Sequence, residues 1–241
     1  MNHKITWLIL SGIILATACS PLKKAHQKFQ LAEYEEAIDM FDRLADKPEY
    51  YAEANFMMAE SYRQSNRIWQ AVPYYEKATA EGFENDSSGF FHAFALKATG
   101  DYEGAREVLG DYLAKADDYD PENKKYLAMA NREMENLNEI DVLKENKSYF
   151  DVQNLEALNT NGPEYSPFVR DDRFYFTSSR DDQSIYKSTG TGYTDVYVAQ
   201  FKDNKVNAAA VKGVGDFINS YGIHEASLAI APNGKTMIFA R

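Results

Sequence analysis

Apolar residues in the first part of the chain recur at the spacing of amphipathic helices, and the pattern repeats along the sequence. Three segments, 31–44, 65–78 and 99–112, align in one register. They share small residues at Ala37, Ala71 and Ala105, and bulky residues four positions later at Phe41, Tyr75 and Leu109. Since residues i and i+4 lie on one face of a helix, each segment is predicted to form a helix that buries this face.

A second set of small residues recurs at the same interval upstream in each repeat, at Ala25, Ala59 and Ala93. Small side chains on two successive helices let the helices approach closely, so the period predicts helix pairs. This pattern resembles the tetratricopeptide repeat. The resemblance implies an α-solenoid of three helix pairs, with a concave surface lined by the first helix of each pair.

The same resemblance implies that seven side chains face the concave surface, namely Phe29, Phe56, Glu60, Arg63, Phe90, Phe94 and Lys97. Aromatic anchors with a polar fringe are typical of a groove that binds a peptide or a protein. Aromatic residues at helical spacing also fill interiors. The alternative is therefore that these Phe side chains pack between repeats or beneath a neighbouring domain.

After the third repeat, Asp120 and Pro121 have the pattern of an N-cap followed by proline at the first helical position. They predict a long helix over 121–145. Its apolar residues form a stripe of helical period, at Tyr126, Leu127, Ala130, Met134, Leu137 and Ile140. We expect this helix to cap the array, because the end of a solenoid exposes an apolar face that needs a cover.

From about Ser148 the pattern changes to short runs of β-branched and aromatic residues between Asn, Gly, Pro and Asp, which predicts strands. The candidate strands are 165–169, 173–178, 195–201, 206–211, 227–230 and 236–240.

Two stretches of this second half, 164–180 and 225–241, are versions of each other, and each begins with a glutamate. The second carries the turn residues Asn233 and Gly234, which suit a tight turn that needs positive φ. The turn at 170–173 in the first is shorter by two residues and has no glycine. The stretches resemble blades of TolB-like, WD-like β-propellers.

Two further motifs extend the resemblance to propellers. Residues 194–201 are similar to the third strand of such blades, and Ile218, Asn219, Ser220 and Glu225 resemble a connection between blades. Residues 164–216 would then form one blade, and 225–241 would open a second. Since a propeller closes with about four to eight blades, we expect this one to be incomplete in the chain.

The N-terminal segment 1–18 follows a different pattern. Residues 5–18 are apolar or small, which is about the length of a signal-peptide core and short for a membrane span. Cys19, the only cysteine, follows Ala16, Thr17 and Ala18 in an arrangement that resembles the lipobox of bacterial lipoproteins. The resemblance implies cleavage before Cys19 and lipidation of its thiol. An ordinary signal-peptidase site is the alternative.

Charge and motifs narrow the function classes. The net charge of the 241 residues is −11, and residues 20–145 hold 15 Lys and Arg against 26 Asp and Glu. A nucleic-acid surface needs clustered positive charge, so this class is excluded for the first half. The sequence contains no G-x-S-x-G or H-E-x-x-H motif, its four histidines are scattered, and the G-x-G at Gly190 lacks the remainder of a nucleotide-binding fingerprint. We expect a protein that is not an enzyme and has no cofactor or metal.

The order of signal peptide (1–18), tetratricopeptide array with capping helix (19–145) and propeller start (146–241) resembles PorE-like envelope lipoproteins of Bacteroidetes, which are associated with type IX secretion. In that family an OmpA-like peptidoglycan-binding domain follows the propeller. The resemblance implies an outer-membrane anchor that faces the periplasm and docks envelope proteins, with a peptidoglycan-binding part beyond Arg241. We therefore expect the chain to be a fragment.

Two other function classes remain open from the sequence. One is a lipoprotein that captures glycans or peptides for nutrient uptake. The other is a hydrolase whose catalytic domain lies beyond Arg241.

Overall fold

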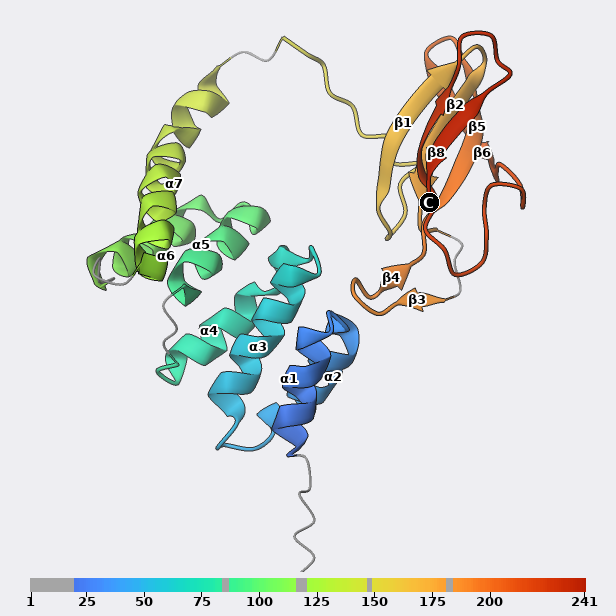
Figure 1. The fold of residues 1–241 in the computed structure, drawn as a ribbon. Helices are drawn as coiled ribbons and strands as arrows, with labels where there is room; N and C mark the ends of the chain where they lie inside the picture. Colours follow the sequence, from blue (N-terminus) through green and yellow to red (C-terminus); the bar gives the residue numbers. More distant parts are fainter. Residues whose placement is uncertain (1–19, 84–86, 116–120, 147–148, 181–183) are drawn as a thin grey trace, which may run out of the picture.

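The structure is a computed structural model that describes residues 20–83, 87–115, 121–146, 149–180 and 184–241. The expected signal peptide and the lipidation site Cys19 lie outside the described residues, as does the expected N-cap Asp120. A helical part comes first and an antiparallel β part follows, joined by an extended segment after the last helix (Figure 1).

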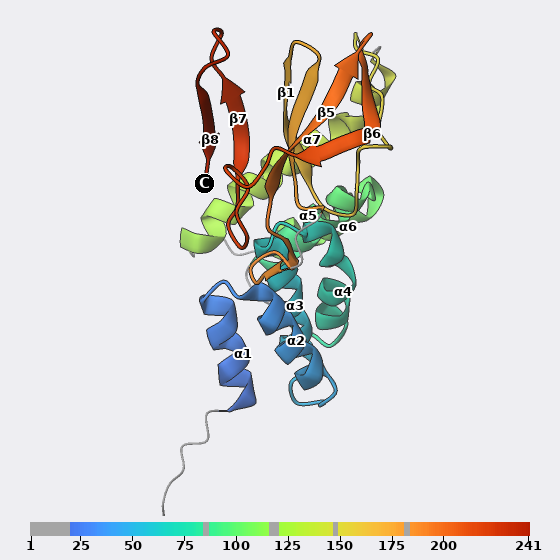
Figure 2. The same ribbon diagram turned by 90° about the vertical axis from the view of Figure 1, so that its right-hand side faces the viewer.

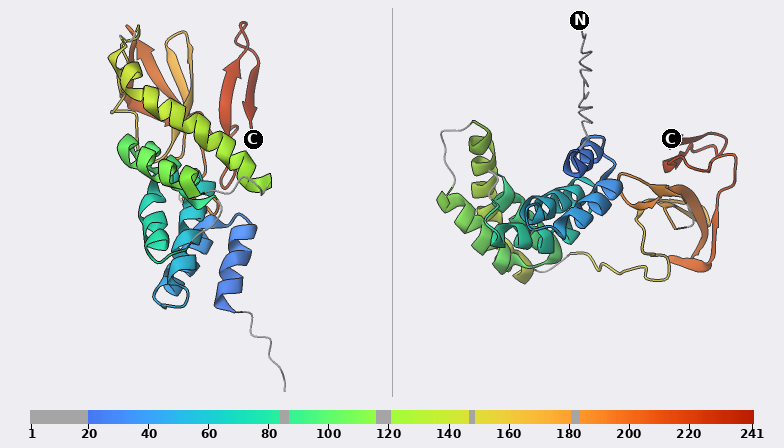
Figure 3. Two further views of the ribbon diagram at one scale, coloured as in Figure 1. Left: turned by 90° about the vertical axis from the view of Figure 1, so that its left-hand side faces the viewer. Right: turned by 90° about the horizontal axis from the view of Figure 1, so that it is seen from below.

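Helices follow one another in antiparallel pairs through the first part, which forms an arc when seen from below (Figure 3). The elements are α1 (Pro21–Gln30), α2 (Tyr34–Ala45), α3 (Tyr51–Gln64), the short 3-10 helix η1 (Ile68–Gln70), α4 (Val72–Ala80), α5 (Ser88–Thr99), α6 (Tyr102–Lys115) and α7 (Pro121–Glu145). The three predicted pairs are confirmed as α1 with α2, α3 with α4, and α5 with α6.

The turn between the two helices of each pair has the same backbone conformation in all three repeats. Ala32, Asn66 and Gly100 have left-handed conformations, with φ of 56°, 61° and 85°. At each turn the next N–H donates to the C=O four residues before the left-handed one, at 3.0, 2.9 and 3.1 Å. These are the bonds of a Schellman motif, which satisfies carbonyls at a helix end. The three turns therefore share one geometry, although only one of them uses glycine.

Side-chain packing follows the same period. The small residues at both predicted sets of positions, Ala25, Ala59 and Ala93 with Ala37, Ala71 and Ala105, are at most 2% exposed. The bulky residues Phe41, Tyr75 and Leu109 are at most 1% exposed and fill the space between helices. The predicted core of the repeats is confirmed.

Helix α7 packs along α6 and covers the end of the array. Ala130 and Leu137 of its predicted apolar stripe are fully buried with Leu109 and Tyr112. The other four stripe residues are partly buried in the same cluster. The expected capping role agrees with these contacts, because α7 shields apolar side chains that the third pair would otherwise expose.

The β part is a four-stranded antiparallel sheet in the order β1-β2-β5-β6, followed by a separate hairpin β7–β8. The strands are β1 (Glu164–Arg170), β2 (Arg173–Ser178), β5 (Asp195–Lys202), β6 (Lys205–Gly213), β7 (Ala226–Ile230) and β8 (Met237–Ala240). All six predicted strands are confirmed to within two residues. A small hairpin of β3 (Ile185–Tyr186) and β4 (Thr191–Gly192) interrupts the chain between β2 and β5, and the sequence pattern does not predict it.

The β7–β8 hairpin stands beside one face of the sheet (Figure 2). Leu228 of β7 and Ile218 of the preceding loop are buried there against Tyr175 and Val196 of the sheet. The turn between β1 and β2 is shorter than the turn between β7 and β8, as the sequence predicts. Asp171 has positive φ in the short turn and Gly234 has it in the long one.

The internal duplication is visible in the backbone. Strands β1 and β7 each contain a β-bulge at the same position, where Ser166 and Ser227 have φ of 51° and 55°. The hydroxyl oxygens of these two serines lie 3.2 Å apart. The β1–β2 and β7–β8 hairpins therefore lie side by side. Both have the same order of strand, bulge and turn, as the two similar sequence stretches predict.

Candidate interaction surfaces

The seven residues predicted to face a groove fall into two groups in the structure. Phe56 and Phe90 are 8% and 1% exposed and belong to the hydrophobic cores of the repeats. Phe56 packs its ring against Tyr75 and Phe83. For these two residues the interpretation as groove anchors is wrong and the alternative holds, because their side chains fill the space between helices. The other five residues are partly exposed.

A polar and aromatic cluster on α3, α4 and α5 contains two of these five residues. The Glu60 carboxylate accepts hydrogen bonds from Arg63 Nη2 at 2.5 Å and from the Tyr75 hydroxyl at 2.5 Å. The Arg63 guanidinium also lies 3.8 Å from the centre of the Phe91 ring, which gives a cation–π contact. Burial lowers the pKa of Arg63, but the bond to Glu60 outweighs it and the net change is a rise. For the Tyr75 hydroxyl, burial acts in the opposite direction and raises the pKa.

Phe29, Phe94 and Lys97 lie on α1 and α5. Phe29 meets Tyr34 edge to face at 5.5 Å between ring centres, within the first helix pair. Lys97 forms an ion pair with Glu133 of α7 and extends over the Phe94 ring. The cation of Lys97 is thus engaged by the capping helix, so Glu60 and Arg63 form the better defined part of the predicted surface.

His92 lies behind this cluster, 8% exposed, with its ring stacked on Tyr75 at 5.7 Å. Burial lowers the pKa of His92 to about 4, so the imidazole is neutral at pH 7. Its Nε2 has no hydrogen-bond partner among the described residues.

The second contact surface joins the two parts of the molecule. We call residues 185–192, which contain β3 and β4, the latch. The backbone C=O of Lys187 accepts the N–H of Glu35 at 3.0 Å, at the start of α2. The Ser188 hydroxyl donates to the C=O of Ala32 at 2.6 Å. The latch therefore binds the turn between α1 and α2, as its position beside α2 in Figure 1 indicates.

Charge complementarity reinforces the latch. Lys187 Nζ lies 2.5 Å from Glu36 and 3.8 Å from Glu33. Hydrogen bonds from Lys187 and from Lys28 lower the pKa of Glu36 to about 2, and hydrogen bonds to these glutamates raise the pKa of both lysines. Water reaches all four of these partly exposed side chains, so water and salt screen the attraction between them.

Gly190 explains part of the latch sequence. A Cβ at Gly190 would collide with the Glu35 carboxylate and would lie 2.6 Å from Arg67 Nη1, and the φ of this glycine is 67°. Close approach and left-handed backbone both favour glycine at this position. The G-x-G pattern, which lacks the remainder of a nucleotide fingerprint, thus marks a contact between the β part and the repeats. It is the one sequence signal of the latch.

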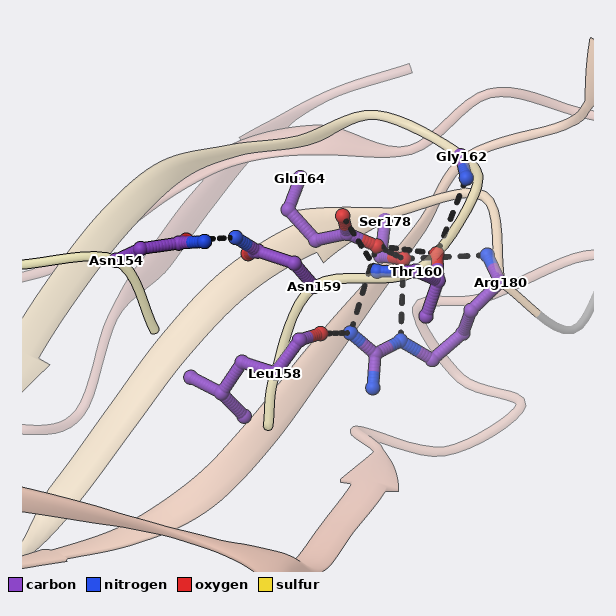
Figure 4. Close-up of polar contacts among 8 residues, drawn as sticks. All are labelled: Asn154, Leu158, Asn159, Thr160, Gly162, Glu164, Ser178 and Arg180. Carbon is purple, nitrogen blue, oxygen red and sulfur yellow. Dashed lines mark hydrogen bonds and ion pairs between the residues drawn. The ribbon is translucent and has the colours of Figure 1, made fainter. Parts of the chain in front are cut away.

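A third polar network holds the loop that precedes the sheet (Figure 4). We call residues 154–163 the first connector. Glu164 accepts hydrogen bonds from the Thr160 N–H at 3.1 Å and the Ser178 hydroxyl at 2.8 Å, and Arg180 lies 3.5 Å away. Arg180 also donates to the C=O of Leu158 at 2.5 Å. Burial alone would raise the pKa of Glu164, but these bonds outweigh it and the pKa falls.

Residues 214–225, which we call the second connector, repeat this arrangement before β7. Glu225, fully buried, accepts hydrogen bonds from the Ser220 N–H at 3.2 Å and from Arg241 Nε at 2.9 Å. Arg241 donates in turn to the C=O of Ile218 at 3.0 Å. The sequence predicts that Glu225 belongs to a connection between two similar β units, but it predicts neither the burial of Glu225 nor its pairing with Arg241.

The described residues hold no group of three or more His, Cys, Asp or Glu side chains placed to bind a metal ion. The adjacent acidic residues 181 and 182 lie outside the described residues. Within the described ranges, no helix has the length and apolar character needed to cross a bilayer.

Comparison with known proteins gives one structural likeness. The chain is similar to PcrH in its crystal structure with the chaperone binding region of PopD, at 20% sequence identity and a TM-score of 0.44. The match covers 55% of this chain and 99% of that one. No protein-family model and no curated protein matches the chain.

Proposed function

We propose that this chain is a non-enzymatic scaffold lipoprotein that is anchored in the outer membrane through Cys19 and faces the periplasm. Its helical repeats and β part dock partner proteins of the cell envelope. By the resemblance given above, the complex that it holds is a secretion complex of type IX or another envelope assembly. A peptidoglycan-binding domain of the OmpA-like kind would lie beyond the residues of this chain.

The observation that carries the docking role is the cluster of Glu60, Arg63 and Phe91 on two successive helix pairs. Arginine and aromatic side chains are enriched among residues that dominate binding energy at protein interfaces. The Arg63 side chain is already fixed by two bonds to Glu60 and by the Phe91 ring. A partner would therefore meet a side chain whose conformational entropy is largely lost before binding.

The latch supports the scaffold role as a second observation. It joins the β part to the first helix pair through backbone hydrogen bonds and through Lys187. A protein that holds two partners in a fixed relation needs its docking parts to be connected by more than a linker. These contacts join two parts of the molecule that are separated in the sequence by all the residues between α2 and β3.

Affinity capture from envelope extracts tests the docking role. We expect at least one envelope protein to bind the parent chain and to bind the Arg63→Ala variant about tenfold less, which is a typical effect for an arginine at a binding hot spot. Arg43→Ala is the matched control, because Arg43 is exposed on α2 outside the cluster. A partner that binds all three chains equally contradicts the assignment to this surface. A specific hit on a glycan array with no protein partner would favour the alternative of a nutrient-binding lipoprotein.

The anchor needs its own test. Incorporation of labelled palmitate into the chain in cells, lost in Cys19→Ala, is the expected result. Three acyl chains give firm membrane attachment, whereas one gives marginal attachment. Fractionation of the parent chain away from the outer membrane would contradict the proposed location.

A further inference from the structure

The latch belongs to the β part but binds the first helix pair through a small set of directional contacts. The Lys187 C=O accepts the Glu35 N–H at 3.0 Å. The Ser188 hydroxyl donates to the C=O of Ala32 at 2.6 Å. Lys187 Nζ lies 2.5 Å from the Glu36 carboxylate. These bonds require a latch beside a turn between α1 and α2, and they are the same whether one chain or two copies of it supply the two sides.

The covalent connection between the two parts is an exposed stretch of chain. We call residues 149–153 the linker. They lie between α7 and the first connector, and none of them belongs to a helix or a strand. In Figure 1 the chain here stands clear of both the helices and the sheet. A rotation within the linker would therefore carry the β part away from its own helices without opening a packed core.

The side chains of the linker are unusually apolar for a segment in water. The exposed fractions of Tyr149, Phe150 and Val152 are 97%, 80% and 88%. Large apolar side chains that gather at an exposed place commonly mark a binding surface. In an extended chain, residues i and i+2 lie on one face, so Phe150 and Val152 form a common apolar face. Two such linkers that cross in opposite directions can cover each other.

We propose that two copies of this chain exchange their β parts. In the exchanged dimer, the latch of each copy binds the turn between α1 and α2 of the other copy, with the contacts that it makes here within one chain. The two linkers cross at the two-fold axis, and each covers Phe150 and Val152 of the other. An exchange of identical elements is a low-cost route to a dimer, because it keeps the interface of the closed chain.

The chemistry of the latch interface selects a second copy as the occupant. The turn presents Glu33 and Glu36 and the latch presents Lys187, so their charges are complementary. Gly190 fits the turn closely, since a Cβ there would collide with the Glu35 carboxylate. A different protein would have to reproduce the cation and the glycine at the same spacing. A second copy carries both, and it adds an identical linker.

The balance between the closed chain and the exchanged dimer depends on concentration and on the linker. Within one chain, the latch has a high effective concentration beside its own turn. The dimer makes the latch contacts twice and adds the contact between linkers, so a rising concentration of the chain favours it. The inference goes beyond the proposed function, and it is independent of the lipid anchor and of the surface that contains Arg63.

A charge exchange between two variants tests the proposal. Lys187→Glu and Glu36→Lys each bring like charges together at the latch, so the dimer of either variant alone is expected to be weak. In an equal mixture, one copy of each variant can form a dimer in which both latch contacts pair opposite charges. Size-exclusion chromatography with light scattering measures the mass. A different fluorescent label on each variant reports whether the dimer contains both.

We expect the parent chain to dimerise as its concentration rises. The mixture should dimerise about tenfold more strongly than either variant alone, because each single-variant dimer contains two unfavourable contacts and the mixed dimer none. A chain that carries both substitutions is the matched control, since it restores the opposite charges and should behave as the parent does.

The linker is tested separately. Val152→Ser should weaken the dimer at least about tenfold, because it removes an apolar side chain that the dimer buries. Gln153→Ser is the matched control at an exposed polar residue of the same linker. The proposal is overturned if the parent chain stays a monomer over the whole range in which it is soluble, or if the mixture dimerises no better than the single variants. Either result leaves partner capture through Arg63 unaffected, so failure here is distinct from failure of the proposed docking role.

Discussion

The helical part and the β part of this chain each repeat a unit, but different interactions hold the units together. In the helical part, neighbouring pairs meet through apolar side chains of complementary size, such as Ala71 and Tyr75, which are at most 1% exposed. In the β part, the second unit meets the first through an apolar contact of Leu228 with Tyr175 and also through polar bonds, such as those of the Asn219 carboxamide to the Val196 backbone. Packing between helices depends on the volumes of the side chains that meet. The polar bonds at the junction between the β units depend on the direction in which each donor and acceptor points.

This difference predicts different responses to mutation. Loss of volume in a helical core leaves a cavity that neighbouring side chains fill only partly, so the effect spreads through the pair. Loss of a single polar atom at the β junction leaves a buried partner without its bond, and the effect stays at that junction. Four experiments test this contrast, and they follow in order of decreasing expected effect.

Phe41→Ala is expected to lower the free energy of unfolding by about 3–5 kcal/mol, because the ring is fully buried between helices. Chemical denaturation followed by circular dichroism at a helical wavelength measures the loss. Leu31→Ala, at a residue that is 61% exposed in the turn between α1 and α2, is the control and should change stability by less than about 0.5 kcal/mol. Equal effects of the two substitutions would contradict a volume-dependent core.

Glu225→Gln is expected to lower the opening free energy of the β7–β8 hairpin by about 1.5–3 kcal/mol, the usual contribution of hydrogen bonds to a charged group. The carboxylate is fully buried, and Arg241 would lose its ionic partner. Hydrogen exchange with mass spectrometry should show faster exchange in β7 and β8 and no change in α1 to α6. Glu156→Gln, at an exposed position, serves as the control. If exchange rises equally in the helices, the effect of Glu225→Gln is not confined to the β7–β8 hairpin.

The stability of the helical part should fall by about 2 kcal/mol between pH 7 and pH 5 because of His92. The folded pKa of His92 is about 4, below its ordinary value of 6.5. Between these values the unfolded chain binds the proton more readily, so stability is present above pH 6.5 and is lost as pH falls toward 4. Denaturation at each pH measures the change. His92→Gln should remove this dependence, and His26→Gln, at a partly exposed histidine paired with Glu53, should retain it.

The smallest expected effect is at the latch, where the two parts meet. Lys187→Glu places a third carboxylate beside Glu33 and Glu36, so the latch should detach without unfolding either part. Faster exchange of the Glu35 amide, which donates to the C=O of Lys187, reports the detachment. Lys187→Arg keeps the charge and should keep the protection.

Acid should have the same effect as Lys187→Glu in the parent protein. The folded pKa of Glu36 is lowered to about 2 from its ordinary 4.5, so its contribution is present above pH 4.5 and is lost as pH falls through 2. A Glu35 amide that stays protected in Lys187→Glu and at low pH would show that the backbone bonds alone hold the latch.

The helical core could be predicted from the sequence because a regular period fixes which small and bulky side chains meet. Ala37 and Phe41 are identified by spacing alone. The same period could not separate a surface aromatic residue from a buried one on the first helix of a pair. Phe56 and Phe90 have the right spacing for a groove, but the neighbouring helices pack over both rings. Whether such a ring is buried depends on the angle between neighbouring helices, and this angle cannot be read from the spacing of residues along one helix.

The β strands and their duplication could also be predicted, because alternation and turn residues are local signals. The latch could not. Its strands are two residues long, and their partner is a helix turn far away in the sequence, so neither periodicity nor propensity marks them. The burial of Glu225 was equally hidden, since a lone glutamate in a polar loop is usually exposed. Only the position of Arg241 beside it shows why the carboxylate can be buried.

The latch has a consequence for the order in which the protein forms. The bond from Ser188 to Ala32 joins positions far apart in the chain, so it closes a long loop between the two parts. The helix pairs have local contacts and can form as they leave the ribosome, whereas the sheet must wait for later residues. The turn between α1 and α2 is therefore synthesised long before the residues that bind it. Until Lys187 is synthesised, Glu33 and Glu36 at the start of α2 have Lys28 as their cation, and the Glu35 N–H lacks the carbonyl that it meets in the folded chain.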